Sequence, residues 1–405
     1  MDNAAIISGY SVHLPFAKNG SELINNLKQG HQVNKTFWFK SDEEARKCGF
    51  GINKRVARLE DENDSAFELI YRLIDDVLAQ AMLDKHCLSG DNVRVYLTGL
   101  GPRVDALDFK CFYDMNDIDD VELTTSAQNL HASKMSQEQL AHNIADKYCL
   151  KYLPPNMHCT SNSSLAAVHL GCQAIEKGDI DLVMVINCSK IKSQDIWFLQ
   201  SQSMLDSDVV QPFGENSKSV LFAEGFNAIL LESSTHRDAR QVTGGIRIKS
   251  AYTQISANRS NDAAHLSVNM LKVMNQVMSD ASVTCDDICA IIPHGNGSEV
   301  SDKAEAKAIS MLLNEQSVPV LAYKGQIGYT TTGSGVVDLV IGCHSLLHGE
   351  LISPVGNDEI IKDIAPYLLV DQGTVKHDKK HLLKVGIGID GSIIGVVMSD
   401  NNSGR

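Results

Sequence analysis

The stretch at residues 158–165 reads His-Cys-Thr-Ser-Asn-Ser-Ser-Leu, and it sets the fold of the chain around it. Apolar residues follow at helical spacing over residues 165–175, and an apolar, β-branched run at residues 182–186 then predicts a buried strand. The hydroxyl-rich stretch is therefore expected to form a turn that enters a helix near Ser161. A helix N-terminus offers unpaired N–H groups and a positive dipole end, which stabilise a nucleophile or an oxyanion placed there.

The same turn also has a purely structural interpretation. Thr160, Ser161 and Asn162 are residue types that favour helix N-caps, so they could serve only to satisfy backbone N–H groups of the helix. The segment alone favours this cap. Further segments, in order along the chain, point to chemistry instead.

Four other segments combine glycine with chemically active side chains. Residues 212–213 (Pro-Phe) precede residues 222–225 (Phe-Ala-Glu-Gly), and residues 293–298 read Pro-His-Gly-Asn-Gly-Ser with Asp302 and Glu305 after them. Residues 323–329 read Tyr-Lys-Gly-Gln-Ile-Gly-Tyr, and residues 386–392 read Gly-Ile-Gly-Ile-Asp-Gly-Ser.

In this order, the segments resemble the motifs of the β-ketoacyl synthase family of the thiolase superfamily. The resemblance places Ser161 at the position of the nucleophilic cysteine and His294 at that of the first catalytic histidine. Lys324 and Glu305 match the family's lysine and glutamate, whereas Tyr329 replaces the second histidine. In the family, the lysine and the acidic residue brace the histidine by charge-assisted hydrogen bonds, and we expect the same here.

The gating elements of the family are altered as well. Ser-Lys-Ser-Val at residues 217–220 stands where the family has Arg-Asp-Gly-Phe, and Ile389 takes the place of the gating phenylalanine. The resemblance implies that Val220, Ile389 and Ser161 line or gate an acyl tunnel.

Condensation needs a cysteine thiolate and two histidines, and two of these three side chains are replaced. A serine hydroxyl stays protonated at neutral pH, and a helix dipole contributes below about 2 kcal/mol, little more than one tenfold in rate. The phenol of Tyr329 has no cationic form that could replace an imidazolium. We therefore expect no catalytic residue for condensation. A register slip that makes Cys159 the nucleophile is a minor alternative, because that residue would lie on the strand side of the turn.

The resemblance implies an α/β, thiolase-like fold in which two similar βαβ halves form five layers, α-β-α-β-α. Residues 1–240 are expected to form the N-terminal ketosynthase-like half, with an insertion at about 110–138, and residues 241–405 the C-terminal half. A polar interruption within residues 232–247 marks the junction.

Composition limits the classes of partner. With 43% hydrophobic and 21% charged residues, the 405-residue chain is expected to be a packed protein, and its net charge of −14 argues against nucleic acid. The absence of a run of about 18 apolar residues or of a signal peptide predicts no membrane partner and a cytoplasmic location. Cys285 and Cys289 form the closest cysteine pair but have no partner ligands nearby, so no metal site is expected.

The degenerate triad resembles the chain length factor of type II polyketide synthases. Such a subunit pairs with an active ketosynthase and shapes the tunnel of the growing polyketide; aryl polyene pathways contain a comparable partner. The resemblance implies no bound cofactor, and acyl groups that arrive on the phosphopantetheine arm of an acyl carrier protein.

Two other functions remain open from the sequence. The chain could be a standalone acyltransferase that uses Ser161 as nucleophile and His294 as base, or, less favoured, a homodimeric protein that binds acyl carriers. The retained His294, Lys324 and Glu305 are compatible with a structural relic and with the transferase alike.

Overall fold

The computed structural model describes residues 3–60, 65–101, 103–107, 109, 136–205, 208–256 and 263–401. Its main element is an eight-stranded mixed sheet with the strand order β4-β5-β6-β1-β7-β12-β11-β8. The strands are β1 (Ala5–His13), β4 (Val93–Gly99), β5 (Leu182–Ser189), β6 (Gly225–Ser233), β7 (Ile246–Ile255), β8 (Ile288–Ile292), β11 (His381–Ile387) and β12 (Ser392–Asp400). Short strands β2 (Thr36–Phe37) and β3 (Arg55–Val56) form one antiparallel pair, and β9 (Glu350–Ile352) pairs with β10 (Thr374–Lys376).

The two halves of the sheet repeat one pattern of strand pairing. In the first half, β4 and β5 are parallel, and β5, β6 and β1 follow in antiparallel order. In the second half, β8 and β11 are parallel, and β11, β12 and β7 are antiparallel. The halves join where residues 5–7 of β1 pair with residues 246–248 of β7. The pairing is thus the same when it is followed outward from this junction on either side.

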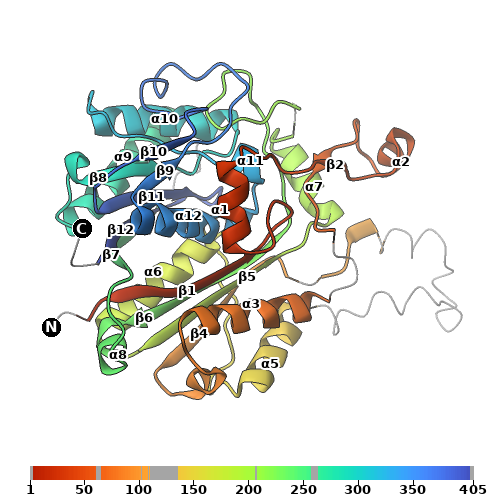
Figure 1. The fold of residues 1–405 in the computed structure, drawn as a ribbon. Helices are drawn as coiled ribbons and strands as arrows, with labels where there is room; N and C mark the ends of the chain where they lie inside the picture. Colours follow the sequence, from red (N-terminus) through yellow and green to blue (C-terminus); the bar gives the residue numbers. More distant parts are fainter. Residues whose placement is uncertain are drawn as a thin grey trace, which may run out of the picture.

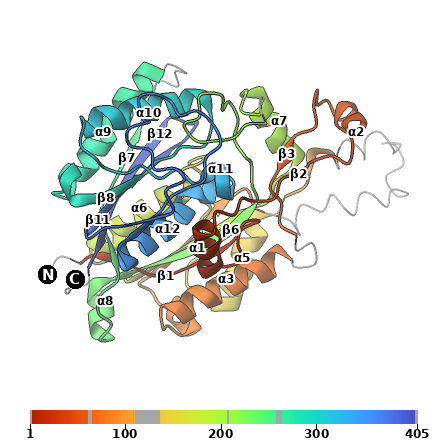
Figure 2. The same ribbon diagram turned by 45° about the horizontal axis from the view of Figure 1, so that its top comes forward.

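Helices cover and separate the two halves of the sheet (Figures 1 and 2). Helices α6 and α12 lie between them, α3 and α5 cover the outer face of the first half, and α9 and α10 cover that of the second. The predicted five-layered arrangement is present. The helices are α1 (Gly20–Lys28), α2 (Asp42–Lys47), α3 (Ala66–Gln80), α5 (Gln137–Tyr148), α6 (Ser163–Glu176), α7 (Ser193–Ser201), α8 (Ser234–Ala239), α9 (Ala263–Asp280), α10 (Glu299–Leu313), α11 (Lys324–Ile327) and α12 (Ser334–His348).

The two central helices touch at a glycine. A Cβ added to Gly335 at the start of α12 would lie 2.4 Å from Cγ of Leu165 on α6, and both residues are buried. A larger side chain at position 335 would therefore push the central helices apart. This close approach fixes the N-terminus of α6, which carries the candidate site.

We expect Gly335→Ala to lower the free energy of unfolding by about 1–3 kcal/mol, since the methyl group overlaps the buried Leu165 side chain. This clash outweighs the helix propensity that alanine gains over glycine. The midpoint of urea unfolding measures the loss. Gly51→Ala is the matched control, because no atom lies within 4 Å of the added Cβ. An equal midpoint for the two variants would contradict the close approach.

Two further sequence predictions concern the first half. The insertion at about 110–138 lies outside the described residues, except for residues 136–138 at the beginning of α5. The polar interruption at residues 232–247 contains the short helix α8 between β6 and β7. Of the helices in the described part of the chain, none is long and apolar enough to span a membrane.

Candidate functional site

The turn before α6 is held by the glycine-rich loop of the other half. Thr160 has a left-handed backbone (φ +42°), and its hydroxyl donates to Oδ1 of Asp390 over 3.1 Å. Asn162 occupies the N-cap position of α6 without a capping hydrogen bond, and its Nδ2 donates to the carbonyl and the hydroxyl of Ser392 over 3.0 and 2.9 Å. The cap interpretation is therefore wrong for these two side chains. They dock the turn onto residues 390–392 and leave Ser161 facing a cavity.

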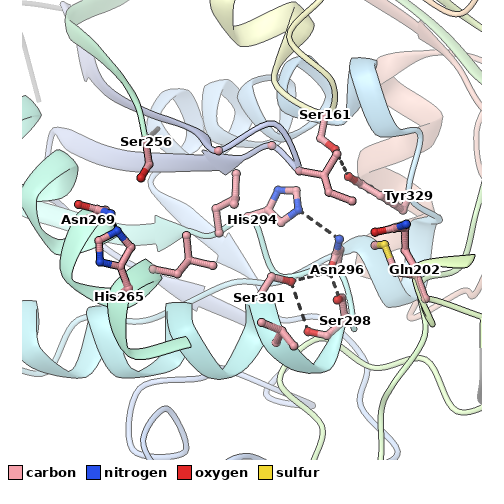
Figure 3. Close-up of a pocket in the computed structure, with 17 residues that line it drawn as sticks. Ser161, Gln202, Ser256, His265, Asn269, His294, Asn296, Ser298, Ser301 and Tyr329 are labelled. Carbon is pink, nitrogen blue, oxygen red and sulfur yellow. Dashed lines mark hydrogen bonds between the residues drawn. The ribbon is translucent and has the colours of Figure 1, made fainter. Parts of the chain in front are cut away.

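This cavity has a volume of about 180 Å³ and brings together Ser161, His294, Tyr329 and Ile389, which are far apart in sequence (Figure 3). No Asp, Glu, Lys or Arg side chain is among the described residues that line it. The others are Gln202, Met204, Ser256, His265, Leu266, Asn269, Asn296, Ser298, Val300, Ser301, Ile387, Gly388 and Gly391.

Tyr329 makes a short hydrogen bond to the residue in the nucleophile position. Its hydroxyl donates to Oγ of Ser161 over 2.5 Å (Figure 3). Backbone hydrogen bonds with Leu221 and Ala223 hold Tyr329 in place, at 2.7 and 3.0 Å. Burial raises the pKa of the phenol to about 12, so the side chain is an uncharged donor at neutral pH. A lone pair of the Ser161 oxygen is thus engaged by a donor that cannot also take the serine proton.

His294 is buried, and its ring is bound by a neighbour on its own turn. Nδ2 of Asn296 donates to Nε2 of His294 over 3.2 Å, and the ring stands at 90° to that of Tyr329 with 5.7 Å between centroids. Burial lowers the pKa of His294 well below its ordinary value, and the charges of Lys324 and Lys384 lower it further. The ring is therefore an uncharged imidazole. Tyr329, and not His294, holds the hydrogen bond to Ser161.

Two buried carboxylates fix the backbone of the His294 turn. Glu305 accepts from the N–H groups of His294 and Gly295 over 2.7 and 2.8 Å. Asp302 accepts from the backbone of Phe213, Asn296 and Gly297. Burial raises the pKa of Glu305 to about 7 and that of Asp302 to about 6. Glu305 therefore braces the turn through main-chain hydrogen bonds rather than through the imidazole, which differs from the expected side-chain bracing.

Lys324 pairs with a residue that the sequence interpretation missed. Its ammonium lies 2.8 Å from Oδ2 of Asp338, and Lys384 lies 2.6 Å from the same oxygen. Each of the three side chains is at most 2% exposed. The sequence did contain a sign of this pairing. Asp338 and Lys384 each interrupt an otherwise apolar run, and a charge buried in such a run needs a partner of opposite charge.

The other predicted site residues are dispersed. Ile389 is 48% exposed and lines the cavity, whereas Val220 is buried in an apolar cluster with Tyr329 and lines a separate small cavity beside Lys54. Cys159 has its thiol towards Asp390 and Ser392, and burial raises its pKa, so it is a poorer nucleophile than an ordinary cysteine.

The sequence matches known family models over most of its length. Residues 3–237 match the family model for the β-ketoacyl synthase N-terminal domain, and residues 246–357 match that for the C-terminal domain. A pikromycin polyketide synthase component, PikAIII of Streptomyces venezuelae, is 26% identical over 207 residues, which are 49% of this chain and 13% of that protein. A probable polyketide synthase of Dictyostelium discoideum is 22% identical over 317 residues, 76% of this chain and 10% of that protein. The chain thus spans a small part of these curated relatives.

Solved structures share the fold over almost the whole chain. One, described as a type II polyketide synthase acyl carrier protein in complex with its ketosynthase, aligns with a TM-score of 0.82 at 18% identity and covers 98% of this chain and 100% of that one. The ishigamide ketosynthase/chain length factor aligns with a TM-score of 0.81 at 17% identity, over 98% and 99%. The predicted thiolase-like α/β fold class is thereby confirmed.

Proposed function

Because the chain belongs to the β-ketoacyl synthase family, we propose that it is a non-condensing subunit of the chain length factor type. In this role it pairs with an active ketosynthase and shapes the tunnel that holds the growing polyketide or polyene chain. The observation that carries the proposal is the hydrogen bond from Tyr329 to Ser161, which joins two of the three reacting positions in an unreactive pair.

The state of the cavity supports a role without covalent chemistry. Attack by Ser161 needs a base that removes its proton, and the nearest hydrogen-bond partner is the phenol of Tyr329, a donor. His294 is uncharged, but its Nε2 is engaged by Asn296. These contacts favour the non-condensing subunit over the transferase that uses Ser161 and His294.

An exposed sheet edge supports a protein partner. Leu97 of β4 binds the carbonyl of Pro155 and the N–H of Met157, so the backbone groups of Asn156 between them point away from the sheet. Leu153, close to this edge, is 48% exposed. An edge that none of the described segments covers, with an exposed apolar side chain beside it, is a template for a second chain, and we propose that the active ketosynthase adds its own strand there.

An acyl carrier protein is the second proposed partner. Its phosphopantetheine arm would deliver acyl groups as thioesters, so that the subunit itself needs no bound cofactor. Two of the structural neighbours support these partners by their described composition, one with a carrier protein on its ketosynthase and one with a ketosynthase and a chain length factor.

The experiment is co-expression with the ketosynthase encoded beside this chain, purification through a tag on this chain only, and measurement of the mass of the complex. A one-to-one complex supports the proposal. A homodimer that gains an acyl mass on Ser161 would instead make the chain a serine-dependent transferase.

Within that complex, we expect Ser161→Ala to leave product formation within about twofold of the wild type. The hydroxyl accepts one hydrogen bond from Tyr329 and takes no part in bond making. Product per complex, measured by mass spectrometry of the released chains, tests this. A loss of more than about tenfold, or about 1.4 kcal/mol of transition-state stabilisation, would assign chemistry to Ser161.

The contrasting variant is Leu153→Asp at the sheet edge. A charge there must be desolvated when the partner binds, so co-purification of the ketosynthase is expected to fall at least tenfold while the fold of this chain is kept. If the ketosynthase still binds this variant tightly, the sheet edge is not part of the interface, and the partner must bind at another surface.

A further inference from the structure

A buried lysine outside the cavity contacts the backbone that leads into His294. Lys384 lies in the middle of β11 within Leu-Leu-Lys-Val and is 1% exposed. Its ammonium donates to the carbonyl of Pro293 over 3.0 Å and lies 2.6 Å from Oδ2 of Asp338. Since Pro293 directly precedes His294, the strand ties this turn to the buried charge cluster.

The cluster holds two cations on one carboxylate. Lys324 on α11 and Lys384 on β11 share the same oxygen of Asp338 on α12. A single pair of opposite charges would be balanced, whereas the second lysine adds a cation where desolvation is costly. The buried carboxyl of Glu305 also interacts with Lys384, and burial lowers the pKa of Lys384 to about 8.

The remaining titratable groups around His294 do not cancel this extra cation at the ring. The carboxylates of Glu305 and Asp302 point to main-chain N–H groups, and burial raises the pKa of both. Tyr329 remains a neutral phenol. At the imidazole the two lysines act in the same direction, and both disfavour its protonated form.

We propose that Lys384 is a positioning residue of the cavity: its hydrogen bond to the carbonyl of Pro293 fixes the turn that carries His294, and with Lys324 it adds positive charge to the surroundings of the imidazole. Around Ser161 the cavity then presents uncharged hydrogen-bonding groups, from Ser161, His294, Asn296, Ser301 and Tyr329, while His265 lines another part of it (Figure 3). These groups suit carbonyl, hydroxyl or amide groups of a ligand. This inference does not depend on pairing with a ketosynthase.

The test uses the chemical reactivity of the ring. Diethyl pyrocarbonate acylates uncharged imidazole but not imidazolium, so the rate of modification at His294, read by peptide mass spectrometry, follows its protonation. N-acetylhistidine in the same tube should lose about tenfold in rate between about pH 7.5 and 5.5, as its ordinary pKa of about 6.5 requires. We expect the wild-type His294 rate to fall by less than about twofold over this range.

Replacement of Lys384 should move the titration of His294 towards the ordinary range of histidine. Lys384→Met removes one cation but leaves Lys324 paired one to one with Asp338, so the pKa of His294 rises and the fall in its rate between about pH 7.5 and 5.5 becomes larger than about twofold. Lys384→Arg keeps the charge and should follow the wild type. Lys376→Met, which removes an ammonium on a side chain that is 73% exposed, is the matched control and should change nothing.

Two results would overturn the proposal. The first is a modification rate of wild-type His294 that falls with pH as that of N-acetylhistidine does, since the ring would then be charged at low pH. This result needs no variant. A folded Lys384→Met chain with an unchanged profile would show that Lys384 does not control the ring. If this variant does not fold, Lys324→Met, which leaves Lys384 on Asp338, tests the same requirement for a second cation.

Discussion

A chain that carries both Ser161→Cys and Tyr329→His is expected to become acylated at position 161 by a short acyl thioester of N-acetylcysteamine. A cysteine has a few per cent of thiolate at neutral pH and is intrinsically nucleophilic, whereas serine needs an activating base. The turn at Thr160 already aims position 161 into the cavity. We expect labelling, measured by intact mass, to rise by on the order of 100-fold over the wild type, the scale of one well-placed acid–base group.

The single variants separate the contribution of the thiol at position 161 from that of the imidazole at position 329. Ser161→Cys alone keeps the phenol of Tyr329 as donor and should label more slowly than the double variant, and Tyr329→His alone should stay unlabelled. Peptide mapping must place the label on position 161 rather than on the nearby Cys159. A folded double variant without label would mean that the turn does not present position 161 for attack.

The second large effect concerns stability. We expect Asp338→Asn to lower the free energy of unfolding by about 3–5 kcal/mol, because it leaves the ammonium groups of Lys324 and Lys384 buried without their shared carboxylate. The shift of the urea midpoint, with the slope of the transition, measures this loss.

Glu299→Gln is the matched control. Its carboxylate pairs with Lys303 at 2.7 Å on the surface of α10, where both side chains are more than 40% exposed, and such a pair contributes about 0.3–0.5 kcal/mol. A loss below about 1 kcal/mol for Asp338→Asn would show that water reaches the cluster or that the lysines rearrange. In that case the proposed effect of Lys384 on His294 should weaken as well.

Local pattern was sufficient for the elements that carry the site. The helical spacing after Leu165 and the apolar run that follows predicted α6 and β5, because the spacing of apolar residues identifies the buried face of a helix or strand. The turns that carry Ser161, His294 and Tyr329 were placed by motifs whose glycines and polar residues are contiguous in the chain. The family resemblance that these motifs carry also implied the five-layered fold.

The tertiary structure decided which side chains from remote segments become hydrogen-bond or ion-pair partners. Tyr329 and Ser161 are 168 residues apart, and nothing in either motif states that the phenol donates to the hydroxyl. Lys324 was expected to brace His294 but pairs with Asp338. Val220, expected at the tunnel, packs in one apolar cluster with Tyr329 and lines a separate small cavity. A sequence specifies which residues are buried through local periodicity. The partner that a buried polar group finds depends on how separate layers stack, and for the cluster beneath His294 only the packed helices and strands determine it.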